Sequence, residues 1–262
     1  MKIVFLGTSK FSKIYRDAIV RAGYEIVKME DSPDLGVIAY YGKILPKKIL
    51  DIPKMGFINV HYSLLPRWRG PSPIQAAILA GDLKTGVTIS KVAPKADVGG
   101  IIAQEEASIL KNETYFEIER KLDDIGQALL VKSIPEWTSG KIIPWKQDES
   151  SATYSKLIKT EDGHIDWEKT PEEISRQIRA LSPNPGTFTF FNGKRLLILK
   201  ASTETAKHNL NPGEVAKSDT GFKIACQNGF IKPPIIKLEG KRETTPEAFL
   251  RGHREIIGAV LK

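Results

Sequence analysis

The chain has 262 residues, of which 41% are hydrophobic, so it can bury a sizeable core, and its length suits two domains better than one. Its 39 Lys and Arg outnumber its 31 Asp and Glu, and the resulting formal net charge of +8 favours an anionic partner. Cys226 is the only cysteine, which excludes an internal disulfide and a cysteine-rich metal site. The start is too short an apolar run for a signal peptide, and nowhere do about 18 apolar residues follow one another. We therefore expect a soluble, cytoplasmic protein without membrane contact, and a monomer.

The first half of the sequence alternates short apolar runs with helical stretches. The apolar runs cover residues 2–6, 24–27, 34–40, 57–61 and 87–92. Such alternation predicts an α/β domain, with a Rossmann-like, mostly parallel sheet and helices on both faces. A long amphipathic helix then begins at the capping box Thr114-x-x-Glu117, and we expect it to close this first domain.

The second half begins with a polar, aperiodic stretch that is typical of a linker. A helix start follows at Thr170-Pro171, and after it come short β-rich runs joined by Asn192-Gly193 and Asn228-Gly229 turns. Several short strands at this spacing predict a small β-barrel. From Thr187 onward the chain carries 13 Lys and Arg against 7 Asp and Glu, so much of the positive charge lies there. We predict a first domain at residues 1–148, a linker at 149–163 and a C-terminal domain at 164–262.

The residues that point to chemistry lie at the end of the apolar run that finishes at His61. Strand side chains alternate, so Asn59 and His61 project to one face, outside the carboxyl end of the strand, where α/β sheets bind ligands. Acyl transfer to an amine needs a proton acceptor and stabilisation of a developing oxyanion, and an imidazole with an amide supplies both. By itself, however, Asn-x-His is more often a polar strand end. Asp97 lies in a turn flanked by Gly99 and Gly100 and is equally compatible with an ordinary turn aspartate, since spacing alone cannot bring it to His61.

The surrounding residues form a longer motif, Asn59-x-His61-x-Ser63-Leu64-Leu65-Pro66-x-x-x-Gly70, with Asp97 downstream. This motif resembles the signature of the folate-dependent formyltransferase family. The version at residues 67–75 is most similar to the members that act on methionyl-tRNA. Further matches at residues 44–46, 81–89, 163–167, 184–186 and 249–253 extend the resemblance over nearly the whole chain.

The resemblance implies that a formyl group passes from 10-formyltetrahydrofolate, as co-substrate, to an amine, expected to be that of initiator methionyl-tRNA. Asn59 and charged His61 would stabilise the oxyanion, and the proton would pass by way of Asp97 and water. The expected folate-binding residues are Tyr41, Gly42, Ile44, Leu45, Pro46, Ser63, Leu64, Leu65 and Pro66. The C-terminal domain would be an OB-like barrel that helps to hold tRNA, and the expected tRNA contacts are Arg67, Arg69, Lys194, Arg195, Lys237, Lys241, Arg242 and Arg251. His164, His208 and His253 show no metal-ligand spacing, and we expect no metal.

The sequence departs from the family pattern in its first part. The stretch between Gly7 and Asn59 is shorter than in the family, which implies that a β-α segment after Val27 is missing. With it goes the basic loop that family members use against the tRNA acceptor arm. The opening Gly7-Thr8 lacks the proline that commonly follows in the family, and Gly100 stands where many relatives have an acidic residue.

Two other functions stay open at this point. The same catalytic core would serve formyl transfer to a different amine, such as an amino sugar on a nucleotide. A chain that kept the scaffold but lost the activity would be an RNA-binding protein. Arg67 and Arg69, which follow a tight turn, would in either case be compatible with plain solvation.

Overall fold

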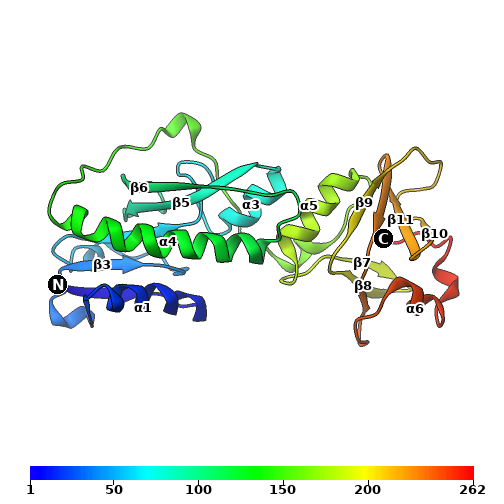
Figure 1. Ribbon diagram of the computed structural model, residues 1–262, viewed down its shortest axis with the longest axis horizontal. Coiled ribbons are helices and arrows are strands. Elements are labelled where there is room, and N and C mark those ends of the chain that lie inside the picture. Colours follow the sequence, from blue (N-terminus) through cyan, green and yellow to red (C-terminus); the bar gives the residue numbers. More distant parts are fainter. The chain divides into compact units, whose positions relative to one another are not determined.

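The computed structural model describes all residues from 1 to 262. The chain forms two compact units, shown in Figure 1. Unit 1 comprises Met1–Ala77, Asp82–Lys111 and Phe116–Leu157. Unit 2 comprises Ile78–Gly81, Asn112–Tyr115 and Ile158–Lys262.

Unit 1 is built on a six-stranded sheet in the order β2-β1-β3-β4-β5-β6. Its strands are β1 (Lys2–Leu6), β2 (Glu25–Val27), β3 (Leu35–Ile38), β4 (Phe57–His61), β5 (Lys84–Lys91) and β6 (Ile101–Ser108). The first four are parallel to one another, whereas β5 pairs antiparallel with both β4 and β6. The prediction of a mostly parallel sheet is therefore confirmed. All four residues of β3 are buried, as expected for a central strand covered on both faces.

The helices of this half of the chain are α1 (Lys13–Arg21), α2 (Lys47–Leu50), α3 (Pro73–Ala80) and α4 (Tyr115–Thr138). In Figure 1 the long α4 runs alongside the sheet. Its buried Ile118, Leu122 and Leu129 form the apolar stripe that the sequence predicted. Helix α1 packs closely on α4 where Tyr15 meets Gly126. The approach leaves no room for a larger residue, since a Cβ added at Gly126 would lie 2.3 Å from the Tyr15 hydroxyl. The two helices therefore share one face of the sheet.

The region after Val27, where the sequence implied a missing segment, holds only a short turn. A single 3-10 turn at Met29–Asp31 separates β2 from β3, and β2 is the edge of the sheet. The sheet is contiguous because both β2 and β3 pair with β1. A shorter connection at this edge therefore leaves the central strands, and what lies at their ends, in place.

Unit 2 contains two α-helices of its own and two small antiparallel sheets around a single apolar core. The sheets have the orders β10-β11-β12-β9 and β13-β8-β7. The elements are α5 (Pro171–Leu181), β7 (Phe188–Phe191), β8 (Lys194–Ile198), β9 (Ser202–Thr205), β10 (Val215–Ser218), β11 (Gly221–Cys226), β12 (Gly229–Lys232), β13 (Ile236–Leu238) and α6 (Pro246–Leu250). We refer to β7 to β13 as the barrel.

Local sequence signals in unit 2 agree with the structure. Thr170 caps α5: its hydroxyl accepts from the Glu173 amide, and the Glu173 carboxylate accepts from the Thr170 amide. Asn192 and Gly193 both have positive φ, 49° and 73°, as a tight turn between β7 and β8 requires. The cap fixes where α5 begins, and the turn fixes the register in which β7 pairs with β8.

The boundary between the units differs from the predicted linker at 149–163. Unit 1 continues to Leu157, and Thr153 to Ser155 lie beside the turn after β4. Tyr154 forms a parallel bridge with Arg69, and the Ser155 amide donates to the Arg69 carbonyl at 2.7 Å. The polar composition resembled a linker because these residues use their backbone, rather than apolar side chains, to bind the turn.

None of the helices combines the length and the apolar composition needed to cross a lipid bilayer.

Candidate active site

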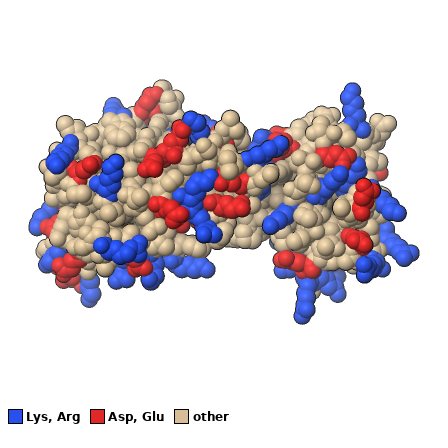
Figure 2. Space-filling model, viewed as in Figure 1, with Lys and Arg blue, Asp and Glu red and all other residues tan.

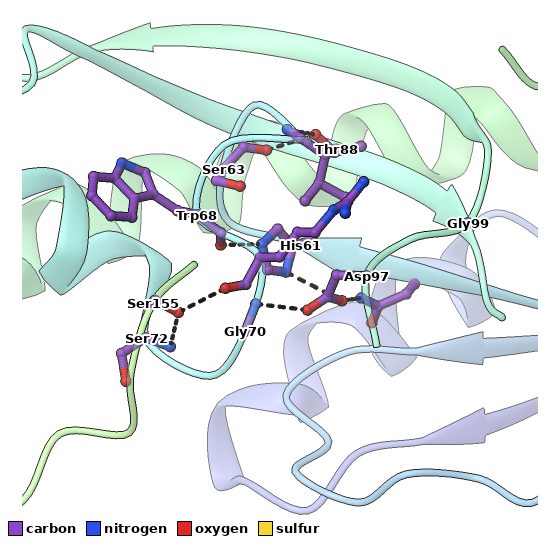
Figure 3. A network of polar contacts seen from close by, with 12 residues as sticks. His61, Ser63, Trp68, Gly70, Ser72, Thr88, Asp97, Gly99 and Ser155 are labelled. Carbon is purple, nitrogen blue, oxygen red and sulfur yellow. Dashed lines mark hydrogen bonds and ion pairs between the residues drawn. The ribbon is translucent and has the colours of Figure 1, made fainter. Parts of the chain in front are cut away.

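His61 and Asp97 lie side by side at the carboxyl end of β4 (Figure 3), and Asn59, two residues before His61 on the same strand, also contacts Asp97. Oδ1 of Asp97 lies 3.6 Å from Nδ1 of His61 and 3.5 Å from the amide nitrogen of Asn59. His61 is 6% exposed and the Asp97 side chain 15% exposed, so little water reaches the pair. The fold thus places one carboxylate oxygen between an amide and an imidazole, which spacing alone could not establish.

The other ring nitrogen of His61 is fixed by the turn that follows. Nε2 lies 2.9 Å from the carbonyl oxygen of Trp68. A carbonyl can only accept, so Nε2 carries a proton, and Nδ1 is the nitrogen that faces Asp97. Trp68 has a φ of 58°, a left-handed conformation that is uncommon for a bulky residue. This local conformation aims its carbonyl at the imidazole and orients the ring.

Asp97 is held through both its side chain and its backbone. Its second oxygen, Oδ2, accepts from the Gly70 amide at 2.9 Å. Its φ of 56° places it in the left-handed region, which Asp tolerates better than most residues. The carboxylate is therefore directed at His61 by a backbone donor from the same turn that orients the imidazole.

Gln147 supports the Asp97 loop from behind. Its side-chain amide donates to the carbonyls of Asp97 and Gly99, at 2.8 and 2.7 Å. Its oxygen accepts from Nε and Nη2 of Arg69, at 3.0 and 2.7 Å. Gln147 is 4% exposed, so these bonds form away from solvent. Gln147 was not singled out from the sequence, because it lies just before the predicted linker, in a polar stretch without periodicity.

The close approach of the Asp97 loop to β5 makes Gly99 a sensitive position. A Cβ at residue 99 would lie 1.6 Å from the Lys91 carbonyl oxygen, so Gly99→Ala must move the loop. We expect the variant to lose about a hundredfold in turnover, since a shift near 1 Å in a reacting group has that effect. Gly252→Ala, which has nothing within 4 Å and no positive φ, is the matched control and should keep parental rates. Steady-state kinetics and the melting temperature of both variants check this, and parental kcat in Gly99→Ala would contradict it.

The turn from Ser63 to Gly70 is held by a hydrogen-bonded frame. The Thr88 hydroxyl donates to the Ser63 carbonyl at 2.6 Å and accepts from the Leu65 amide at 3.1 Å. Gln104 donates to the Leu65 carbonyl at 2.8 Å. Ser63 and Leu65 are 1% and 3% exposed. Of the expected folate contacts in this turn, these two therefore offer no accessible side chain, whereas Leu64 and Pro66 are half-buried.

The expected folate segment at 41–46 follows β3, at the same edge of the sheet as the end of β4. Tyr41 and Leu45 pack partly against an apolar cluster that contains Ile38 and Phe57. Ile44 is 75% exposed, and a Cβ at Gly42 would meet nothing within 4 Å. Tyr41 and Leu45 therefore anchor the segment, and between them the large apolar side chain of Ile44 is exposed to water.

Arg67 and Arg69 have different environments, although both were expected to contact tRNA. Arg69 is 1% exposed, and both oxygens of Glu149 bind it at 2.7 and 2.9 Å, so it braces the turn and is not available at the surface. The expectation for Arg69 is corrected accordingly. Arg67 is partly exposed and forms a bidentate pair with Asp82, at 2.6 and 2.9 Å. Asp82 also accepts from the Trp68 indole at 2.7 Å and so holds the same turn.

The barrel residues expected to contact tRNA fall into one group and one outlier. Lys194 and Arg195 begin β8. Lys237 lies on the neighbouring β13, where it pairs with Leu197 of β8. Lys241 and Arg242 follow in the turn after β13, whereas Arg251 caps the separate helix α6. Figure 2 shows Lys and Arg side chains projecting from the surface of unit 2, interspersed with acidic ones. We call the five residues on β8, β13 and the following turn the β8–β13 basic group.

The side chains of His, Cys, Asp and Glu nowhere gather in threes in a way that could hold a metal ion.

Residues 2–134 match the formyl transferase family, and residues 157–254 match the family's C-terminal domain. The methionyl-tRNA formyltransferase of Coxiella burnetii is 40% identical over 221 residues, which are 84% of this chain and 70% of that protein. Among solved structures, HypX from Aquifex aeolicus in complex with tetrahydrofolic acid superposes with a TM-score of 0.73 at 19% identity; the match covers 97% of this chain and 47% of HypX. The N-formyltransferase from Helicobacter canadensis, in complex with folinic acid and dTDP-3-aminofucose, gives 0.70 at 19% identity over 93% and 100% of the two chains. The site formed by Asn59, His61 and Asp97 lies within residues 2–134. The chain therefore belongs to the formyl transferase family, over both of its units.

Proposed function

We propose that this enzyme transfers a formyl group from 10-formyltetrahydrofolate to the amino group of methionyl-tRNA, with initiator methionyl-tRNA as the acceptor. The observation that carries the proposal is the placement of the Asp97 carboxylate between the Asn59 amide and the His61 imidazole. The 40% identity to a relative named methionyl-tRNA formyltransferase, over 84% of the chain, supports the choice of acceptor. The site lies within unit 1 of a single chain, so we propose a monomer, and we propose the cytoplasm as its location.

Asn59 and His61 act as donors in this proposal. An amide N–H and a protonated imidazole N–H stabilise negative charge that develops on a carbonyl oxygen, and losing one such donor typically costs a hundredfold or more in rate. His61 is suited to this because its other nitrogen is already bound to the Trp68 carbonyl, which fixes the ring before substrate arrives. Nδ1 is then the nitrogen that can exchange a proton at the site.

Asp97 takes part in proton movement. The attacking α-amino group has a reference pKa of about 7.7–8.0, so it needs only modest help to lose its proton. Oδ1 of Asp97, 3.6 Å from Nδ1 of His61, accepts that proton directly or through a water and passes it to the leaving nitrogen. Oδ2 stays bound to the Gly70 amide, so the carboxylate keeps its orientation while Oδ1 works.

The residues at the carboxyl edge of the sheet fit a folate. A flat pteridine ring needs an apolar surface with a few polar groups at its rim. Ile44, 75% exposed, with half-buried Tyr41 and Leu45, gives the surface, and half-buried Leu64 and Pro66 extend it from the turn after β4. The bound donor supplies the formyl group; the chain supplies the donors and the carboxylate beside it.

Ile44→Ser is expected to raise the KM for 10-formyltetrahydrofolate by roughly tenfold with little change in kcat, because it removes apolar contact made equally in the ground and transition states. Ile143→Ser is the matched control, since Ile143 is 86% exposed and lies outside the segment. Initial rates at varied donor concentration give both constants. A fall in kcat with unchanged KM would contradict the assignment of Ile44 to donor binding.

One assay tests the proposed function directly. Purified protein is incubated with 10-formyltetrahydrofolate and charged initiator tRNA, and the product is examined for formylmethionine. A nucleotide-linked amino sugar is the comparison acceptor, because the fold is shared with an N-formyltransferase solved with such a compound. Formylation of the sugar alone would replace the proposed acceptor. No formylation of either, with tRNA still bound, would favour a non-catalytic RNA-binding protein.

A further inference from the structure

A buried cluster of three tyrosines and one aspartate joins four elements of unit 1. Tyr15 lies in α1, Tyr40 follows β3, Tyr62 follows β4, and Asp123 lies in α4. Oδ1 of Asp123 accepts from the hydroxyls of Tyr62, Tyr40 and Tyr15, the latter two at 2.9 and 3.5 Å. The hydroxyl oxygens of Tyr15 and Tyr62 are 2.9 Å apart, and the rings of Tyr40 and Tyr62 have centroids 5.2 Å apart. We call these four residues the Tyr–Asp cluster.

Burial of this cluster opposes folding unless its polar atoms are well paired. Tyr15 and Tyr62 are 0% and 8% exposed, and Asp123 is 9% exposed. Burial raises the pKa of the Asp123 carboxyl, while the hydroxyls of Tyr62 and Tyr40 act against this rise by stabilising the charged form. Apolar side chains of the same size would pack here without that desolvation cost. Stability alone therefore does not account for the cluster. Directional hydrogen bonds to one oxygen do, however, fix the positions of the four elements relative to one another.

One element fixed in this way is the start of the proposed folate segment. Tyr40 has a φ of 53°, a conformation that side chains other than Gly adopt uncommonly. Its carbonyl accepts from both the amide and the hydroxyl of Thr8, at 3.1 and 3.0 Å, while its own hydroxyl is bound to Asp123. Backbone and side chain together thus set the direction in which the chain leaves β3 toward residues 41–46.

The second element is the end of β4. Tyr62 is the residue after His61, and the two side chains have separate partners. His61 contacts Trp68 and Asp97, whereas Tyr62 contacts Tyr15 and Asp123. The strand end is therefore held from the helix side by the Tyr–Asp cluster and from the reacting side by the turn.

We propose that Asp123 is a positioning residue, which through Tyr40 and Tyr62 holds the donor-binding segment 41–46 and the His61 end of β4 in one fixed relation. This inference rests on the proposed function, because it assigns donor binding to that segment and chemistry to His61. It adds residues that touch neither donor nor acceptor.

The test replaces the whole cluster by apolar side chains of similar size, in the variant Y15F/Y40F/Y62F/D123L. We expect a melting temperature equal to or above that of the parent, because no polar atom of the cluster is left unpaired. We expect kcat/KM for 10-formyltetrahydrofolate to fall by roughly ten- to a hundredfold, with KM raised, because small displacements of positioned groups have effects of this size. Binding of unreactive 5-formyltetrahydrofolate, measured by calorimetry, should weaken by the same factor as KM rises.

The control is Ser133→Ala, which removes another buried hydroxyl from α4, one that donates to the Leu129 carbonyl at 2.7 Å. It should keep the parental KM. A quadruple variant that keeps parental melting temperature, KM and kcat would overturn the inference. If that variant does not fold, Tyr40→Phe alone removes one hydroxyl from a half-buried ring and should raise the donor KM severalfold in a protein that still folds; an unchanged KM overturns the inference. Absence of formyl transfer in the parent would instead sink the proposed function, so the two failures are distinguishable.

Discussion

Replacing His61 or Asp97 by alanine is expected to lower formyl transfer by about a thousandfold or more while the protein stays folded. Each variant removes one partner of the contact between Nδ1 and Oδ1, which lie 3.6 Å apart. His61→Ala leaves the Trp68 carbonyl without its donor, and Asp97→Ala leaves the Gly70 amide without its acceptor, so each costs about 1–3 kcal/mol of stability. Single-turnover rates and chemical denaturation of the same samples separate the two effects.

The double variant should lose hardly more activity than either single one, because groups that act as one unit are not additive. His164→Ala, which changes an exposed histidine of unit 2, is the control and should keep near-parental rates. Near-normal turnover in His61→Ala or Asp97→Ala would refute the assignment of that residue to the chemistry.

Neutralising the β8–β13 basic group is expected to weaken tRNA use by about a hundredfold at low salt. Binding directed mainly at phosphates loses one released counterion for each neutralised contact, and a protein with several such contacts loses orders of magnitude between about 50 and 200 mM salt. The parent should therefore show a steep fall in kcat/KM for tRNA with salt, and the variant a shallow one. The residues changed to Gln are Lys194, Arg195, Lys237, Lys241 and Arg242.

A matched control changes exposed lysines of unit 1, namely Lys13, Lys28 and Lys47, and should leave the salt slope unchanged. Because phosphate contacts carry no sequence information, we also expect only a weak preference for initiator over other methionyl-tRNA. Comparing kcat/KM for the two charged tRNAs at both salt concentrations measures this. A strong initiator preference that is insensitive to salt and to the five substitutions would show that discrimination lies elsewhere.

Elements defined by local signals could be predicted from the sequence. The apolar runs predicted the parallel strands β1, β3 and β4, because strands in the middle of a sheet that is covered on both faces are mostly apolar. Thr170 with Pro171 predicted a helix start, and Asn192 with Gly193 predicted a hairpin, since each pair acts within a few residues. The strand position of Asn59 and His61 followed from the same reasoning.

Features that depend on distant contacts could not be predicted in this way. Arg69 follows a turn, where arginines are usually solvated, yet it is buried because Gln147 and Glu149 meet it from far along the chain. The Tyr–Asp cluster likewise draws its members from α1, α4 and the ends of two strands, and no local pattern links them. The approach of Asp97 to His61 is of the same kind: it came from a resemblance, not from spacing.

The pairing of residues 153–155 with the turn after β4 decides where this chain can be cut. Composition suggests ending a catalytic fragment at residue 148, but such a fragment would lose the Glu149 carboxylate from Arg69, the Thr153 hydroxyl that accepts from the Trp68 amide, and the Ser155 amide bound to the Arg69 carbonyl. The turn that contains Trp68 would then be mobile. The Trp68 carbonyl would move with it and would no longer orient the His61 ring. A protease or a gene fusion acting after Leu157 would leave these contacts whole. A cut after residue 157 is therefore expected to leave the site around His61 ordered, whereas a cut after residue 148 is expected to disorder it.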